Sequence, residues 1–288
     1  GFFDQKDSWL RDRSWSVHAL IYDYTTGSAF QGGSFRTPEG IVGLPQNPDG
    51  SPLADCIANP LCNHLVSTNA TWASEVFVRD PSVPTYGWRL ATDADRYNYA
   101  ADNYLTIPTR RVQFFSIGDT RFGAARAYYE ASYVQRTAQL NAAPMPLNPG
   151  DYTVGGGTTP ISVSRDSMYN PFGVDLPFAG RRLVEFGNRT YSDELSTFRL
   201  VTGLDGTLPE AAGPFGDWYW DASLNYGRTQ GTFTTEGAIR NSRIADAVGP
   251  SMEIGGVPSC VSTPGDPDTV IPGCVPLALF GGPGNGSI

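Results

Sequence analysis

The chain has 288 residues, a formal net charge of −9 and only 17% charged side chains. An acidic chain repels the phosphate backbone, so nucleic acid is not expected as a partner. Aromatic side chains make up 12% of the residues, which argues against a disordered chain. No run of about 18 apolar residues is present, so the sequence predicts no transmembrane helix.

Residues 1–105 are predicted to be mostly loop. The exception is a strand over residues 14–24, in which Trp15 and Val17 begin an alternating pattern. Turn signals rich in glycine, proline and aspartate follow it, for example at residues 47–50. A segment this long with so little regular structure is unusual inside a compact domain.

A first long hairpin is predicted over residues 106–137, with its turn at residues 118–121. The ascending strand places Tyr129 and Tyr133 on an apolar face, and charged side chains occupy the opposite face. Successive side chains of a strand point to opposite sides of a sheet, so this alternation predicts one apolar and one polar surface.

A second long loop is predicted over residues 138–180 and a second hairpin over residues 181–231. A tight turn is expected at residues 204–207. The ascending strand, residues 218–230, is the clearest of the chain, and residues 232–288 are predicted to be loop again.

The strand over residues 218–230 alternates Trp220 and Leu224 with polar side chains such as Asp221 and Asn225. One long descending strand that begins at Arg182 is compatible with the sequence, because Val184 and Phe186 would lie on the same face of it as Phe198. Together the two hairpins supply the candidate lipid-facing residues, which are Tyr129, Tyr133, Trp220 and Leu224.

Short turns join the strands on one side and long loops join them on the other. This asymmetry is typical of outer-membrane barrels, whose apolar face meets lipid and whose polar face meets a lumen. We therefore predict an all-β fold: an antiparallel segment of a transmembrane β-barrel, made of two long hairpins with long extracellular loops. The aromatic residues near the strand ends are expected to form a girdle at the membrane surface.

The four cysteines form two local pairs in loops, Cys56 with Cys62 and Cys260 with Cys274. Local pairs in exposed loops favour disulfides in an oxidising compartment. The alternative is a zinc site, but neither spacing is that of a zinc motif and only two histidines are present.

No catalytic constellation is recognised, so the chain is not expected to be an enzyme. A nucleophile needs a positioned base, and only His18 and His64 are available for that role. No cofactor or resident metal is predicted. A loop calcium is left open at two short acidic turns, residues 47–51 and 266–268, although both are too short for an EF-hand.

Several phrases resemble TonB-dependent outer-membrane receptors in their order and spacing. They lie at residues 97–111, 122–133, 169–173, 197–206, 218–227 and 274–282. The resemblance implies a segment of a large barrel that imports a scarce nutrient of the iron-siderophore, cobalamin or oligosaccharide class. It implies a bacterial outer-membrane location, with the loops facing the exterior. The implied partners are membrane lipid, the rest of the barrel with its plug, and TonB.

The chain shows no plug-like segment and no TonB box, so we expect an internal segment of a longer receptor, with TonB acting through a region absent from it. Substrate contacts are expected from loop aromatics, which are Tyr97, Tyr99, Tyr104, Tyr169 and Phe172. The alternative is a secreted, soluble β-rich module that binds carbohydrate, or a hydrolase that uses loop carboxylates.

Overall fold

The computed structural model describes residues 1–282, which form two compact units. The first unit, the long sheet, comprises Gly1–Trp9, Tyr104–Asn141 and Thr190–Glu236. The second unit comprises Leu10–Asn103, Ala142–Arg189 and the chain from Gly237 onward. Each unit is therefore assembled from segments that are far apart in the sequence.

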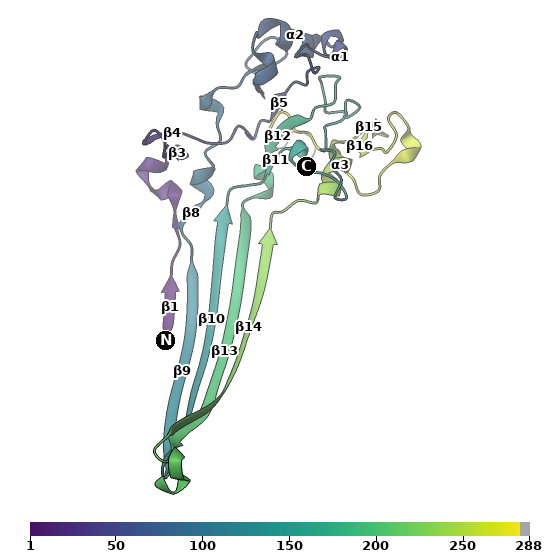
Figure 1. Cartoon of the computed structure of the whole chain (residues 1–288). Coiled ribbons are helices and arrows are strands. Elements are labelled where there is room, and N and C mark those ends of the chain that lie inside the picture. The colour runs from purple at the N-terminus through teal and green to yellow at the C-terminus, as the bar shows by residue number, and fades with distance from the viewer. Residues whose placement is uncertain (283–288) are drawn as a thin grey trace. The chain divides into compact units, whose positions relative to one another are not determined.

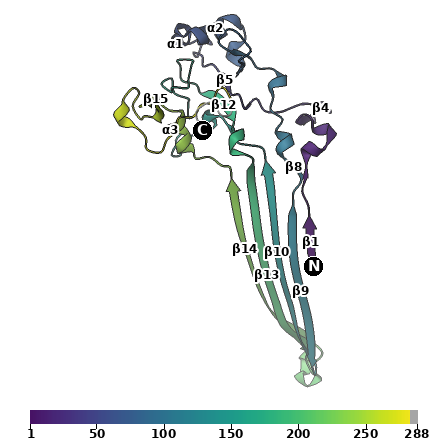
Figure 2. The ribbon, with the colours of Figure 1, turned by 180° about the vertical axis from the view of Figure 1, so that it is seen from behind.

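The long sheet has five strands in the order β1-β9-β10-β13-β14 (Figures 1 and 2). They are β1 (Phe2–Gln5), β9 (Thr109–Phe122), β10 (Ala125–Ala142), β13 (Arg189–Thr207) and β14 (Tyr219–Glu236). The predicted antiparallel hairpins are confirmed as β9–β10 and β13–β14, and their strands extend further than expected. No sheet among the described residues closes into a barrel.

Both predicted turns are wrong, because their glycines lie inside strands. The β9–β10 turn is Gly123 and Ala124, and β13 connects to β14 through residues 208–218. A Cβ on Gly118 would lie 2.5 Å from the ring of Tyr129, and one on Gly206 would lie 2.6 Å from the carbonyl oxygen of Ala124. Both glycines allow a close approach, by an aromatic ring of the neighbouring strand in the first case and by the backbone of the neighbouring turn in the second.

The descending strand of the second hairpin does not begin at Arg182. The strand β12 (Phe178–Arg182) ends there, and a 3₁₀ helix, η7 (Val184–Phe186), intervenes before β13. Gly187 follows at a φ of 73°, which breaks the extended backbone.

The second unit contains a mixed set of short elements. A five-stranded sheet has the order β11 (Pro146–Leu147), β12, β5 (Ile41–Gly43), β6 (Phe77–Arg79) and β7 (Trp88–Leu90). The α-helices are α1 (Ala54–Ala58), α2 (Pro60–Thr68) and α3 (Asn241–Val248). Two short hairpins also belong to this unit: β3 (Leu20–Asp23) with β4 (Ser28–Gln31), and β15 (Ser251–Ile254) with β16 (Val257–Cys260). In the first unit, β2 (Ser8–Trp9) pairs with β8 (Tyr104–Thr106) in a sheet of their own. The remaining 3₁₀ helices are η1 (Leu10–Asp12), η2 (Ser14–Ser16), η3 (Trp72–Ser74), η4 (Asp93–Asp95), η5 (Tyr99–Asp102), η6 (Pro149–Asp151), η8 (Glu210–Phe215) and η9 (Pro267–Thr269).

The predicted loops 1–105, 138–180 and 232–288 are thus corrected: within the described residues they supply most of a packed unit. Its core joins residues from all three segments, including Phe77, Phe172 and Leu279. The first segment also contributes β1 to the long sheet, and residues 232–236 are still part of β14. The remaining loop residues 283–288 lie outside the described part of the chain.

The strand predicted over residues 14–24 forms only at β3. Ser16 hydrogen-bonds through its hydroxyl to the carbonyls of Leu10 and Arg13, which favours the 3₁₀ turn η2. The side-chain amide of Asn98 donates to the carbonyls of Ser16 and Val17, both at 2.9 Å. In a strand these carbonyls would instead accept from the backbone of a neighbouring strand.

The two expected disulfides are formed, Cys56–Cys62 and Cys260–Cys274. The first fastens α1 to α2, and the second ties β16 to the segment that follows η9. Small, irregular regions gain stability from such links because the cross-link restricts the unfolded chain.

An arginine links two carboxylates in the second unit. Arg89 donates to Asp80 at 2.7 Å and makes two bonds to Asp95, at 2.7 and 2.8 Å. Asp95 also accepts from the backbone and hydroxyl of Thr92. The bonds from Arg89, aided by those from Thr92, lower the pKa of Asp95 to about 2.

We expect Asp95→Asn to destabilise the second unit by about 1–3 kcal/mol at pH 7. The folded pKa lies below the ordinary value of 3.8, so the contribution is present above about pH 4 and is lost as the pH falls toward 2. Thermal unfolding of both proteins across this range tests it. Asp93, which is exposed and pairs only with Arg96, provides the control Asp93→Asn. A deficit of Asp95→Asn that persists at pH 2 would contradict the assignment.

Candidate functional site

One face of the long sheet carries most of its apolar side chains, and we call it the apolar face. The register places Phe114 beside Tyr133 and Thr202 beside Leu224, and paired residues share a face. The bond from Gln135 to Glu194, 2.7 Å long, puts the same face of β10 next to that of β13. Its apolar residues are Val112, Phe114, Phe122, Ala125, Ala127, Tyr129, Ala131, Tyr133, Phe198, Leu200, Leu204, Trp220, Ala222, Leu224 and Tyr226.

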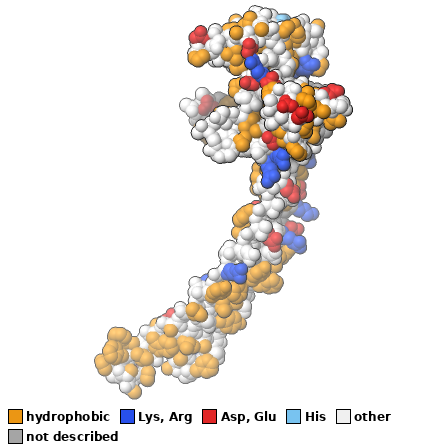
Figure 3. Space-filling view, turned by 90° about the vertical axis from the view of Figure 1, so that its right-hand side faces the viewer, with side chains coloured by type: hydrophobic (Ala, Val, Ile, Leu, Met, Phe, Trp, Pro, Cys, Tyr) orange, Lys and Arg blue, Asp and Glu red, His pale blue; other side chains and the backbone are white. Residues whose placement is uncertain are grey.

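Apart from Val112, these residues lie between the hairpin ends and the level at which Phe114 pairs with Tyr133. Figure 3 shows hydrophobic side chains gathered over the part of the sheet nearest the hairpin ends. Aromatic side chains bound this apolar band at both limits. Phe122 and Trp220 lie at the hairpin end. The other limit is marked by Phe114 with Tyr133, and by Phe198 with Tyr226, whose ring centroids are 6.3 Å apart.

The two aromatic pairs that form the second limit lie at matching levels on their strands. Tyr133 and Phe198 are each seven residues from the ion pair that joins Arg126 on β10 to Asp205 on β13. On β9, Phe114 and Phe122 are eight residues apart. At about 3.3 Å per residue, the band is roughly 26 Å long along the strand.

The opposite face of the same strands is mostly polar and cross-linked, although it also carries the exposed Phe115 and Ile117, and we call it the polar face. Arg126 pairs with Asp205 at 2.6 Å, and Asp205 is 6% exposed. Tyr128 donates to Asp221 at 2.9 Å. Arg199 lies 3.4 Å from Glu130. These contacts between side chains connect β10 with β13 and with β14.

The four candidate lipid-facing residues all lie on the apolar face. Tyr129, Tyr133 and Leu224 are 44%, 38% and 68% exposed, and Trp220 is half-buried. The structure thus groups them on one surface, while their contact with lipid stays a prediction.

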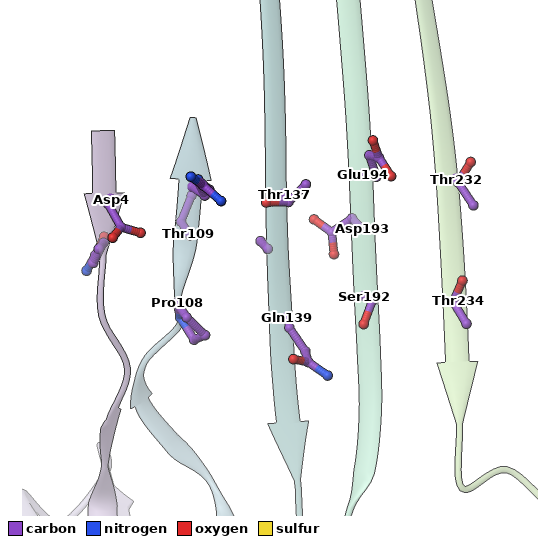
Figure 4. A pocket seen from close by; sticks show the side chains of 13 residues that line it. Asp4, Pro108, Thr109, Thr137, Gln139, Ser192, Asp193, Glu194, Thr232 and Thr234 are labelled. Carbon is purple, nitrogen blue, oxygen red and sulfur yellow. The ribbon is translucent and has the colours of Figure 1, made fainter. Parts of the chain in front are cut away.

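Beyond the apolar band the same face becomes polar and contains a hollow of about 410 Å³. Figure 4 shows the hydroxyl, amide and carboxylate side chains that line it from β10, β13 and β14, among them Thr137, Ser192, Glu194 and Thr232. Glu194 is already bonded to Gln135. The apolar face therefore changes character at the level of the second aromatic limit.

An aromatic cavity of about 570 Å³ lies in the second unit. Tyr86, Trp88 and Tyr169 line it together with Arg79 and Asn59. Rings and a guanidinium of this kind suit a ligand that is stacked and hydrogen-bonded at once. The N-terminal residues of α2 form part of the wall, and the Cys56–Cys62 disulfide fixes that helix.

Tyr86, Trp88 and Arg79 line this cavity, and the sequence did not single them out. The φ of Tyr86 is 61°, which is uncommon for an aromatic residue and marks local strain. Arg79 holds the backbone there by donating to the carbonyls of Tyr86 at 2.6 Å and Gly87 at 3.1 Å. In the sequence, the pair Tyr86-Gly87 could have indicated this position, since it predicts a turn with an aromatic side chain at its tip.

Of the five loop aromatics, only Tyr169 lines this cavity. Phe172 is wrong as a ligand contact, since it is fully buried between Trp88 and Phe280. Tyr97 donates to Asp102, and burial together with this bond raises the pKa of Tyr97.

Tyr104 and Tyr99 are also placed away from the aromatic cavity. Tyr104 belongs to β8, which pairs with β2 in the first unit, and its ring centroid is 4.4 Å from that of Trp9. Tyr99 begins η5 and is half-buried.

The acidic turns considered for calcium use their carboxylates locally. Asp49 accepts from the backbone and hydroxyl of Ser51, and Asp266 accepts from the backbone of Asp268. Among residues 1–282, no three His, Cys, Asp or Glu side chains gather as a metal site would require. Within the same range, no helix combines the length and apolarity needed to cross a bilayer.

No protein-family model, curated protein or solved structure matches the chain. Its function is therefore inferred from its own residues.

Proposed function

We propose that the chain is a segment of a TonB-dependent outer-membrane receptor. In this proposal the long sheet is part of the barrel wall, and the second unit consists of extracellular loops. The chain contributes to import of a nutrient of the iron-siderophore, cobalamin or oligosaccharide class and performs no catalysis.

The observation that carries the proposal is the apolar band between two aromatic limits. Outer-membrane barrels expose an apolar band about 25 Å tall, flanked by aromatic girdles, and their strands are tilted by about 35–45°. The band here is roughly 26 Å along the strand, which at that tilt corresponds to a height of about 18–21 Å, comparable with a barrel's band. The polar face supports the same assignment. The Arg126–Asp205 pair would be costly against lipid but is suited to a wet lumen.

The connections are consistent with this orientation. The hairpin ends of β9–β10 and β13–β14 are joined by 2 and 11 residues, respectively. At the opposite strand ends, two segments of the second unit, Leu10–Asn103 and Ala142–Arg189, lead from β1 to β9 and from β10 to β13, and both are far longer. Barrels have short periplasmic turns and long extracellular loops, so in this proposal the second unit lies outside the cell.

The sheet needs neighbours if it lies in a membrane. Its outer strands are β1, which is only 4 residues long, and β14. Unpaired backbone groups are not tolerated in lipid, so further strands of a barrel would cover these edges. A plug and TonB would complete the transporter, and the cavity beside Tyr86 and Tyr169 would contact substrate.

Detergent dependence tests the proposal. We expect the purified chain to remain dispersed only with detergent or lipid, because its apolar band is exposed on one face. Sedimentation of the full chain, with and without detergent, is the measurement. A stable, water-soluble monomer would overturn the assignment.

That outcome would favour the second candidate function, a secreted β-rich module that binds carbohydrate. The observation behind it is the aromatic cavity, in which Tyr86 is held in a strained conformation by Arg79. Sugar rings stack on aromatic side chains in the same way as other flat apolar surfaces.

A further inference from the structure

A second cavity in the second unit is almost wholly apolar. Its volume is about 760 Å³, within the range of small-molecule sites. The floor includes Leu183, Ile244 and Leu277, which are all less than 9% exposed. Phe186 and Val275, by contrast, are 55% and 60% exposed. Apolar side chains left open beside a hollow mark a surface that a ligand covers.

The cavity has one charged side chain in its lining, Arg243 on α3. The nearest acidic partner of this guanidinium is Asp246, 3.9 Å away, and both side chains are partly exposed. Such a surface pair is weak, so Arg243 retains much of its capacity for another anion. Glu185, which adjoins Phe186 in the chain, is already paired with the buried Arg181. Arg243 is therefore the group in this lining that can bind an anion.

The walls are held by covalent and backbone links. Cys274 lines the cavity and is bonded to Cys260. The backbone of Leu277 donates to the carbonyl of Ala247 at 2.8 Å, which fastens the last segment to α3. A cavity with fixed walls loses little conformational entropy when it is filled.

We propose that this cavity binds a linear aliphatic carboxylate, with the alkyl chain on the apolar floor and the carboxylate paired with Arg243. Apolar lining alone would accept any hydrocarbon, and the single guanidinium makes the site select an anion. The inference is independent of the proposed function, because every residue it uses lies in the second unit and none is in the long sheet.

The test is calorimetric titration of the full chain with hexanoate, octanoate and decanoate, against a blank of the same composition without protein. Each added methylene group is expected to tighten binding about fourfold. Octan-1-ol should bind about tenfold more weakly than octanoate, since it lacks the charge.

Arg243→Gln is expected to weaken octanoate binding about tenfold, leaving octanol unchanged. Arg240→Gln is the matched control, because Arg240 precedes α3 and is not part of the cavity lining; it should change neither ligand. Ala247→Trp, which fills the cavity, should abolish binding of both.

The proposal is overturned if octanoate shows no saturable binding, or if octanoate and octanol bind equally. It is also overturned if Arg243→Gln and Arg240→Gln have the same effect. Arg243 is more than half exposed, so its substitution tests the site even where Ala247→Trp fails to fold. Solubility of the chain without detergent bears on the proposed function alone, so the two failures are distinguishable.

Discussion

Leu224→Arg is expected to prevent stable insertion of the protein into the outer membrane. Leu224 is 68% exposed and lies on the apolar face inside the band, four residues from Trp220 and two from Tyr226. An arginine facing lipid at the midplane of a barrel costs about 2–4 kcal/mol. The measurement is the amount of protein, expressed in cells at its native length, that fractionates with the outer membrane.

Two variants on the same strand make this result specific. Asn225→Arg is the matched control, since Asn225 is the next residue and points to the polar face, where arginine is tolerated. Trp220→Arg should be milder than Leu224→Arg, because the cost falls to about 0–1 kcal/mol near the membrane surface. Equal insertion of Leu224→Arg and Asn225→Arg would refute the lipid-facing assignment.

Phe172→Ala is expected to lower the free energy of unfolding of the second unit by about 3–5 kcal/mol. Phe172 is fully buried, with ring centroids 5.0 Å from Trp88 and 5.8 Å from Phe280. Truncation removes the ring and leaves a cavity that rigid neighbours cannot fill. Denaturant unfolding followed by near-ultraviolet circular dichroism measures the change.

Tyr24→Ala provides the control for this prediction. Tyr24 is in the same unit and is 90% exposed, so its loss should change stability by no more than about 0.5 kcal/mol. A Phe172→Ala protein as stable as Tyr24→Ala, with only its ligand binding altered, would restore the role first predicted for Phe172.

The hairpins were predictable because their signals are local. In β14, Trp220 and Leu224 alternate with Asp221 and Asn225, and that period alone assigns each side chain to a face. The cysteine pairs were predictable for a similar reason, since the two cysteines of each pair are only 6 or 14 residues apart in the sequence. The turns were not, because Gly118 and Gly206 look identical in sequence to turn glycines.

The candidate site was predictable only in part. Tyr169 was selected from a loop phrase and does line the aromatic cavity, whereas Phe172 of the same phrase is core. Nothing within that phrase separates the two roles. The difference is made by Trp88 and Phe280, which come from distant segments and enclose Phe172.

By itself, the sequence determined the two hairpins of the long sheet, the side chains that share each of their faces, and the two disulfides. Alternation and short spacing are properties of neighbouring residues, and they need no knowledge of the rest of the chain. The tertiary structure alone decided that the supposed loops pack into a unit, that Tyr86 is strained beside Arg79, and that an apolar cavity opens beside Arg243. Those features depend on contacts between residues many positions apart, and burial at such contacts is set by the whole fold.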